Sequence, residues 1–165
     1  PQGPLTPRPV DTELLKALEA KFDAANTASN CDFVVKLTQN QVDYLVNEVI
    51  KNIGWKGLEA YAVSKVADDF EEQVAQAKEV DEAMEITVKY DLLEAVFHFL
   101  RSHASSGYDE AKKFTAVAEV FVTPINELTA LRKKAQECAV ELEAAKHGMS
   151  PDEFVKKFQE SQGKN

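Results

Sequence analysis

The placement of glycine and proline limits the fold of this chain more than any other feature. Four of the six prolines lie within the first nine residues, at Pro1, Pro4, Pro7 and Pro9. Away from the two ends, glycine occurs at only four positions, Gly54, Gly57, Gly107 and Gly148. Because glycine weakens helix interiors and suits helix ends, these positions predict the boundaries between helices. We therefore expect an extended Pro-rich arm over residues 1–10, one helical domain over 11–160 and a tail over 161–165.

Between these breaks, apolar residues recur at helical steps of three and four. Thr38 and Gln41 form a capping box ahead of a helix that we expect to end at Gly54. A last helix is signalled by Ser150 as N-cap, with Pro151 and Glu153 in its first turn. We find no alternation of the kind that marks β-strands. The pattern predicts an all-α fold, an elongated bundle of about six or seven helices.

The segment from Leu58 to Lys89 contains neither glycine nor proline. Its apolar residues fit one helical face, which predicts a single helix of about 30 residues, roughly 45 Å long at 1.5 Å per residue. This expected helix is acidic, because residues 68–85 hold eight acids against the single Lys78. The acids are Asp68, Asp69, Glu71, Glu72, Glu79, Asp81, Glu82 and Glu85. Two interpretations stay open: a solvated helix face, or a docking face for a basic partner.

Trp55 is the only tryptophan and lies between two glycines at an expected helix junction. Such a side chain either closes the edge of a core or, when exposed, anchors an interface. We include it among the candidate protein-binding residues, together with the eight acids and with Pro4, Pro7 and Pro9 of the arm.

Two of the three histidines lie in the segment Glu94–His103, and Glu94 precedes His98 by one helical turn. Glu143 and His147 repeat that spacing, so a helical-bundle enzyme or metal carrier using Glu94, His98, Glu143 and His147 is the alternative function. Di-iron bundles, however, use Glu and His three residues apart rather than four. His147 beside Gly148 is also explained by contact with the last carbonyls of a helix. We therefore predict no catalytic residue, cofactor or metal, and the sequence contains no nucleophile elbow, phosphate loop or calcium loop.

The composition limits the partners. The net charge of −9 provides no basic footprint for nucleic acid. No apolar run approaches the roughly 20 residues that span a bilayer, so we expect no membrane contact. Cys31 and Cys138 show neither a CxxC nor a zinc spacing, and two reduced thiols without a secretory segment predict a cytoplasmic protein.

Two segments carry a family resemblance: "YDLLEAVFHFLRSH", then after a short polar loop "DEAKKFTAVAEVFVTPINEL". With the earlier "LTQNQVDYLVNEVIKN", they resemble small CLAMP-like subunits of the C1a projection in the ciliary central apparatus. The segment "VTPINELTALRKK" departs from the aromatic-rich stretch of that family. The resemblance implies a non-enzymatic structural or adaptor subunit of an axonemal complex in a cilium or flagellum. Its partners would be other protein subunits, with calmodulin as a candidate.

Overall fold

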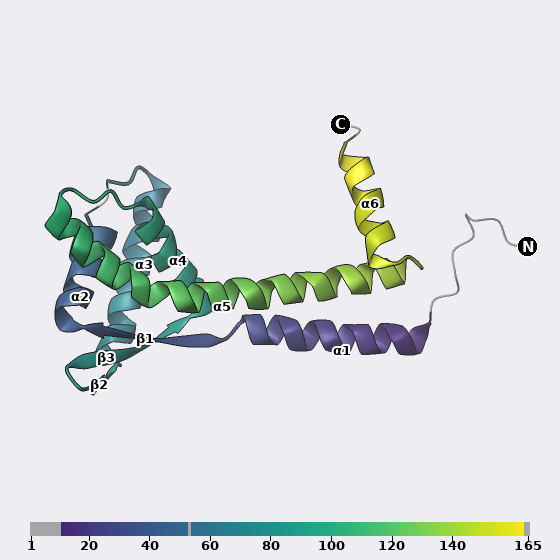
Figure 1. Cartoon of the computed structure of the whole chain (residues 1–165), viewed down its shortest axis with the longest axis horizontal. Helices are drawn as coiled ribbons and strands as arrows, with labels where there is room; N and C mark the ends of the chain where they lie inside the picture. Colours follow the sequence, from purple (N-terminus) through teal and green to yellow (C-terminus); the bar gives the residue numbers. More distant parts are fainter. Residues whose placement is uncertain (1–10, 53, 164–165) are drawn as a thin grey trace, which may run out of the picture. The chain divides into compact units, whose positions relative to one another are not determined.

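The computed structural model describes residues 11–52 and 54–163 (Figure 1). The Pro-rich arm, with Pro4, Pro7 and Pro9, lies outside the described residues. The elements are α1 (Thr12–Ser29), β1 (Asp32–Thr38), α2 (Gln39–Tyr44), the π-helix η1 (Leu45–Ile50), α3 (Leu58–Ala75), β2 (Lys78–Val80), β3 (Ala83–Lys89), α4 (Tyr90–Ser102), α5 (Tyr108–Lys146) and α6 (Pro151–Gln162). The fold is predominantly helical, as expected, but the strictly all-α prediction is wrong because a three-stranded sheet is present.

By their internal contacts the residues form two compact units. The sheet unit is formed by the described residues of 30–128, and the helical unit by residues 11–29 with 129–163. Helix α5 contributes residues to both units and continues through Pro124. The expectation of one domain over residues 11–160 stays a prediction, because two contact units that share a helix can belong to one domain.

The single helix expected over residues 58–89 is wrong. The expected helix over residues 58–89 ends at Ala75, and the chain then forms the antiparallel hairpin β2–β3. The two residues of its turn, Asp81 and Glu82, have φ angles of 51° and 66°. Two central residues with positive φ are typical of the type I′ turn that joins paired strands. Because this turn lacks the usual Asn-Gly or Asp-Gly, the sequence gives no clear hairpin signal.

The sheet has the strand order β1-β3-β2, and all seven residues of β1 pair antiparallel with β3. Along β1, Phe33, Val35 and Leu37 are buried while their neighbours are exposed. They face Val88, Ile86 and Met84 of β3 across the ladder, which makes one apolar face. Helices α2, α3 and α4 contact this sheet and lie on one side of it in Figure 1. The core of the sheet unit lies in between and includes the fully buried Phe70, Leu93, Phe121 and Leu45.

The helical unit contains α1, the later part of α5, and α6. Lys21 forms an ion pair of 3.0 Å with Glu141, and Ala25 packs with Ala135 and Cys138, so α1 and α5 run side by side and antiparallel (Figure 1). Along this part of α5, the side chains of Ala135, Cys138 and Leu142 are buried.

The predicted helix caps are accurate. Thr38 Oγ1 accepts from the backbone N–H of Gln41, while Gln41 Oε1 accepts from the backbone N–H of Thr38, at 3.2 and 2.9 Å. Ser150 Oγ accepts from the N–H of Glu153 at 3.2 Å and starts α6. Gly148 ends α5 with a φ of 66°, and the N–H of Met149 donates to the carbonyl of Ala144. The helix after the capping box ends as η1 at Ile50, four residues before Gly54.

Candidate functional site

The eight acidic candidates do not share one helix face, because the helix that was expected to carry them is broken. Asp68, Asp69, Glu71 and Glu72 lie on α3, whereas Glu79 is on β2, Asp81 and Glu82 form the turn, and Glu85 is on β3. Glu85 pairs with Lys36 of β1 at 3.6 Å. The single acidic helix over residues 68–85 is therefore wrong, four of the acids are grouped on α3, and the role of all eight in docking stays a prediction.

The structure does bring Trp55 together with the α3 acids. A hollow of about 410 Å³ lies between the loop after η1 and the first three turns of α3, and its lining includes both Trp55 and Asp68. Its other lining residues are Lys51, Ala60, Val63, Ser64 and Ala67. The floor is apolar, since Val63 and Ala67 are buried. We call this hollow and the exposed residues of α3 beside it the α3 surface.

Trp55 is held at the edge of the core rather than inside it. Its ring is half-buried and meets the ring of Phe99 edge to face, with the centroids 5.4 Å apart. The indole Nε1 is buried and has no hydrogen-bond partner among the described residues. Trp55 therefore closes the edge of the core, as one of the two sequence-based interpretations expected, and its role in docking stays a prediction.

Two large apolar side chains stand exposed at the start of α3. Leu58 is 89% exposed and Tyr61 is 73% exposed. The sequence placed Leu58 on the buried face, but α3 begins at this residue and its buried positions are Val63, Ala67 and Phe70. Tyr61, Ser64 and Asp68 follow steps of three and four, so they share one stripe along the hollow. Ser64 and Asp68 of this stripe line the hollow together with Trp55.

The charge of the α3 surface is acidic but not uniform. Lys51 at the edge of the hollow forms an ion pair with Glu71 at 2.5 Å. Asp68, Asp69 and Glu72 form no ion pair with any residue in 11–52 or 54–163. Asp68 lines the hollow, and the carboxylates of Asp69 and Glu72 add negative charge to the same helix, which favours a basic group beside the hollow.

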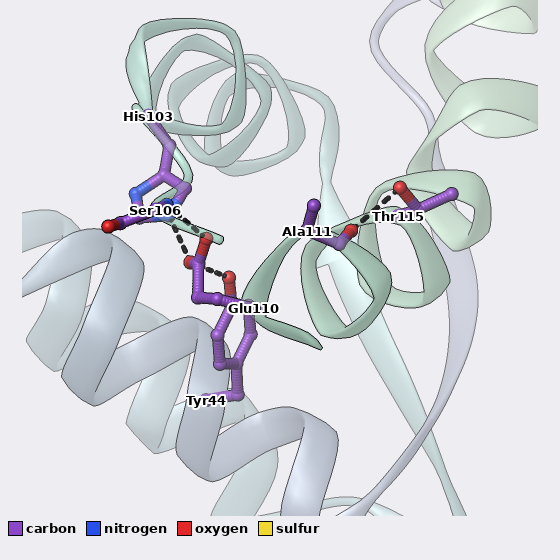
Figure 2. A network of polar contacts seen from close by, with 6 residues as sticks. All are labelled: Tyr44, His103, Ser106, Glu110, Ala111 and Thr115. Atoms are coloured by element: carbon purple, nitrogen blue, oxygen red, sulfur yellow. Dashed lines mark hydrogen bonds and ion pairs between the residues drawn. The ribbon is translucent and has the colours of Figure 1, made fainter. Parts of the chain in front are cut away.

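A second polar centre lies elsewhere in the sheet unit and was not predicted (Figure 2). The hydroxyl of Tyr44 donates to Glu110 Oε1 at 2.5 Å, and Nε2 of His103 lies 2.7 Å from the same oxygen. The backbone N–H of Ser106 donates to Glu110 Oε2 at 3.0 Å. Because an ionised carboxylate only accepts, His103 is the donor in its contact. The ring of His103 also stacks on Phe114, with centroids 5.2 Å apart.

These contacts shift the pKa values of Glu110 and Tyr44. Hydrogen bonds from Tyr44 and then His103 lower the pKa of Glu110 to about 2. Burial, followed by the hydrogen bond to the Glu110 carboxylate, raises the pKa of Tyr44. Glu110 also lies in the first turn of α5, where the helix dipole favours a negative charge. The carboxylate thus stays ionised and ties α2, the end of α4 and the start of α5 together.

Beside Tyr44 there is another hollow, of about 470 Å³, between α2, η1 and α5. Its lining mixes polar side chains, such as Asn40, Asn47, Glu48 and Lys113, with the apolar Ala116 and Val117. None of these residues was among the candidate site residues. The clearest available signal was the acidic start of the segment "YDE" after a loop, which marks Glu110 as a helix N-terminal residue but does not reveal its partners.

The residues of the alternative function serve other contacts. Glu143 pairs with Lys146 at 3.3 Å, and His147 stacks on Phe154 with centroids 5.7 Å apart. Glu94 and His98 lie on α4, in the other unit. Among the described residues, no group of three or more His, Cys, Asp and Glu side chains is arranged to hold a metal ion. Nor is any helix in the described part of the chain long and apolar enough to cross a membrane.

Comparisons of this chain with protein-family models, with curated proteins and with solved structures found no match. The α3 surface, with the hollow lined by Trp55 and Asp68, is the feature of this chain that indicates a function.

Proposed function

We propose that this chain is a non-enzymatic adaptor subunit of a larger protein assembly and that its α3 surface docks a basic segment of a partner chain. The observation that carries the proposal is the hollow lined by Trp55 and Asp68, with the exposed Leu58 and Tyr61 at the same end of α3. Tryptophan and tyrosine dominate the binding energy of many protein interfaces, since they bury a large area and retain a polar end.

The partner segment that fits this surface has two properties. It carries an apolar side chain, because the floor of the hollow is formed by Val63 and Ala67. It also carries lysine or arginine beside that side chain, because Asp68, Asp69 and Glu72 form no ion pair within the described part of the chain. An amphipathic basic helix has both properties within one turn.

The first test is direct binding of a probe. Trp55 is the only tryptophan, so all tryptophan emission comes from a side chain that lines the hollow. We expect a synthetic amphipathic helix of leucine and lysine to change this emission, and the effect to weaken as salt is added. The matched control is a peptide of the same pattern with glutamate in place of lysine. Equal responses to both peptides would remove the charge argument.

The second test concerns assembly in the native cell. Asp68→Lys with Glu72→Lys reverses two charges on α3, and Glu79→Lys with Glu82→Lys makes the same change of charge on the β2–β3 hairpin. We expect the first pair to lose the partner chains that co-purify with the wild type in fixed ratio, and the second pair to retain them. Circular dichroism checks that both variants fold. Retention by both pairs would exclude the α3 surface as the docking site.

The cellular address is a separate proposal, which rests on the resemblance of the segments within residues 90–128 to central-apparatus subunits. We propose that the assembly is axonemal and that calmodulin is among its members. The test is whether the chains that co-purify are axonemal, and whether calmodulin is one of them. Partners from another compartment would leave the adaptor role in place and change its address.

A further inference from the structure

The outer edge of β1 is open. β1 is an edge strand, and its seven residues pair with β3 on one side only. On its other side, no residue of 11–52 or 54–163 completes a backbone ladder. Proteins usually protect such an edge by a very short strand, a bulge, a proline or charged side chains, and of these β1 has only the charged Asp32 and Lys36. The opposite edge, β2, is only three residues long, whereas β1 is seven residues long, unbroken in register and free of proline and glycine.

The exposed face of β1 has an apolar centre between two opposite charges. Asp32, Val34, Lys36 and Thr38 lie on this face, and Val34 is 57% exposed. Asp32 and Lys36 are equally far from Val34, one on each side. A second copy of the same strand, turned through 180° about Val34, therefore presents each charge to its opposite.

We propose that the outer edge of β1 pairs antiparallel with β1 of a second copy of this chain, across a two-fold axis at Val34. The two sheets then form one sheet of six strands. The pairing places Val34 against Val34 and sets Asp32 of each copy opposite Lys36 of the other. Opposite charges facing each other across a ladder stabilise the pair, as do apolar contacts.

The register follows from the side-chain faces. A shift by one residue would set the exposed face of one strand beside the buried face of the other. Centring the axis on Phe33 or Val35 keeps the faces matched, but it sets Asp32 opposite Val34 or Val34 opposite Lys36. Both ion pairs are then lost. Because a single added strand buries less than the roughly 1,200 Å² of a standard interface, we expect a weak dimer that forms with rising concentration.

Cysteine cross-linking tests the register. Residues directly opposite in an antiparallel ladder have Cα atoms about 4.5–5.5 Å apart, which a disulfide can bridge. In the full chain with Cys31→Ser, Val34→Cys is expected to give a disulfide-linked dimer under mild oxidation. Lys36→Cys is the control. In this register residue 36 faces residue 32 of the second copy, so the two cysteines at position 36 are four residues, about 13 Å, apart along the strand. Failure of Val34→Cys to cross-link, or equal cross-linking by both, would overturn the proposal.

A charge exchange tests the contact in solution by analytical ultracentrifugation. Lys36→Asp sets two acids opposite each other in both pairs, so the dimer is expected to be lost. Asp32→Lys combined with Lys36→Asp restores both pairs and is expected to restore the dimer. Within one chain, the exchange sets like charges against Glu85 and Lys89, so recovery has to come from contacts between copies. A monomeric wild type up to millimolar concentration, or a dimer indifferent to Lys36→Asp, would contradict the pairing.

Discussion

The core of the sheet unit and the core of the helical unit are formed by side chains of very different size. In the sheet unit, Phe70, Phe121 and Ile86 are fully buried among many other large apolar residues. In the helical unit, the buried cluster is Ala25, Ala135 and Cys138, with Phe22 packed partly against it. Small side chains allow close helix packing, but they remove little apolar surface from water. We therefore expect the sheet unit to be the stable scaffold and the helical unit to open at a lower free energy.

The largest expected effect is the loss of a core ring in the sheet unit. Phe70→Ala is expected to lower the free energy of unfolding by about 3–5 kcal/mol, because the ring is fully buried and leaves a cavity. Urea unfolding followed by Trp55 fluorescence measures this loss. Phe22→Ala in the helical unit is the matched variant, and we expect it to cost less and to leave the Trp55 transition in place. Equal losses would erase the difference between the two units.

The contacts of Glu110 with Tyr44, His103 and Ser106 (Figure 2) add to the stability of the sheet unit and make that stability depend on pH. Because the pKa of Glu110 falls from the ordinary 4.5 to about 2, its contribution to stability is complete above pH 4.5 and is lost as the pH falls towards 2. Tyr44→Phe removes one donor, so we expect the pKa of Glu110 to rise. We also expect the free energy of unfolding at pH 7 to fall by about 1 kcal/mol.

A carboxyl NMR titration measures the pKa, and urea unfolding measures the stability. Tyr61→Phe is the control, because the hydroxyl of Tyr61 belongs to an exposed side chain. A matching loss in both variants would mean that Glu110 contributes nothing specific to the sheet unit.

The turn of the β2–β3 hairpin offers a smaller change in the opposite direction. Glu82 has a φ of 66°, a conformation that costs roughly 1 kcal/mol for a residue with a Cβ. Glu82→Gly removes this cost, so the midpoint of urea unfolding of the sheet unit is expected to rise. Glu79→Gly on β2 is the control and is expected to lower the midpoint, because an extended strand gains nothing from glycine. A decrease in both variants would argue against the I′ turn.

The smallest effect is expected at the ion pair between Lys21 and Glu141 in the helical unit. Both side chains are solvent-exposed, so water and salt weaken their attraction. Lys21→Met is expected to change the thermal midpoint only slightly at low salt and not at all at high salt. Lys16→Met, on the exposed surface of the same helix, provides the reference. A clear loss at high salt would show that the helical unit depends on this pair more than on its small apolar core.

Local signals predicted the helix ends well, because a cap is formed by residues close in sequence. Thr38, Ser150 and Gly148 all act as expected. The hairpin was missed since its turn contains Asp81 and Glu82 rather than glycine, and because Met84 and Val88, one helical turn apart, also fit a helix face. A pairing between distant strands leaves little trace in local sequence.

The candidate site shows the same limit. Trp55 and Asp68 were predicted as binding residues, and they line one hollow. Tyr61 was not, because its exposure depends on α3 starting at Leu58. The contacts of Glu110 with Tyr44 and His103 join positions up to 66 residues apart, and no spacing rule brings them together.

The buried thiol of Cys138 gives the small core of the helical unit a chemical consequence. Cys138 lies in the seam between α1 and α5, out of reach of water-borne reagents while the seam is closed. When the seam opens, an electrophile that captures this sulfur leaves a group too large for the space beside Ala25. The helices then cannot pack together again, so each opening that is captured is irreversible. The rate of alkylation at Cys138, with the partly exposed Cys31 as internal standard, therefore measures how often this unit opens.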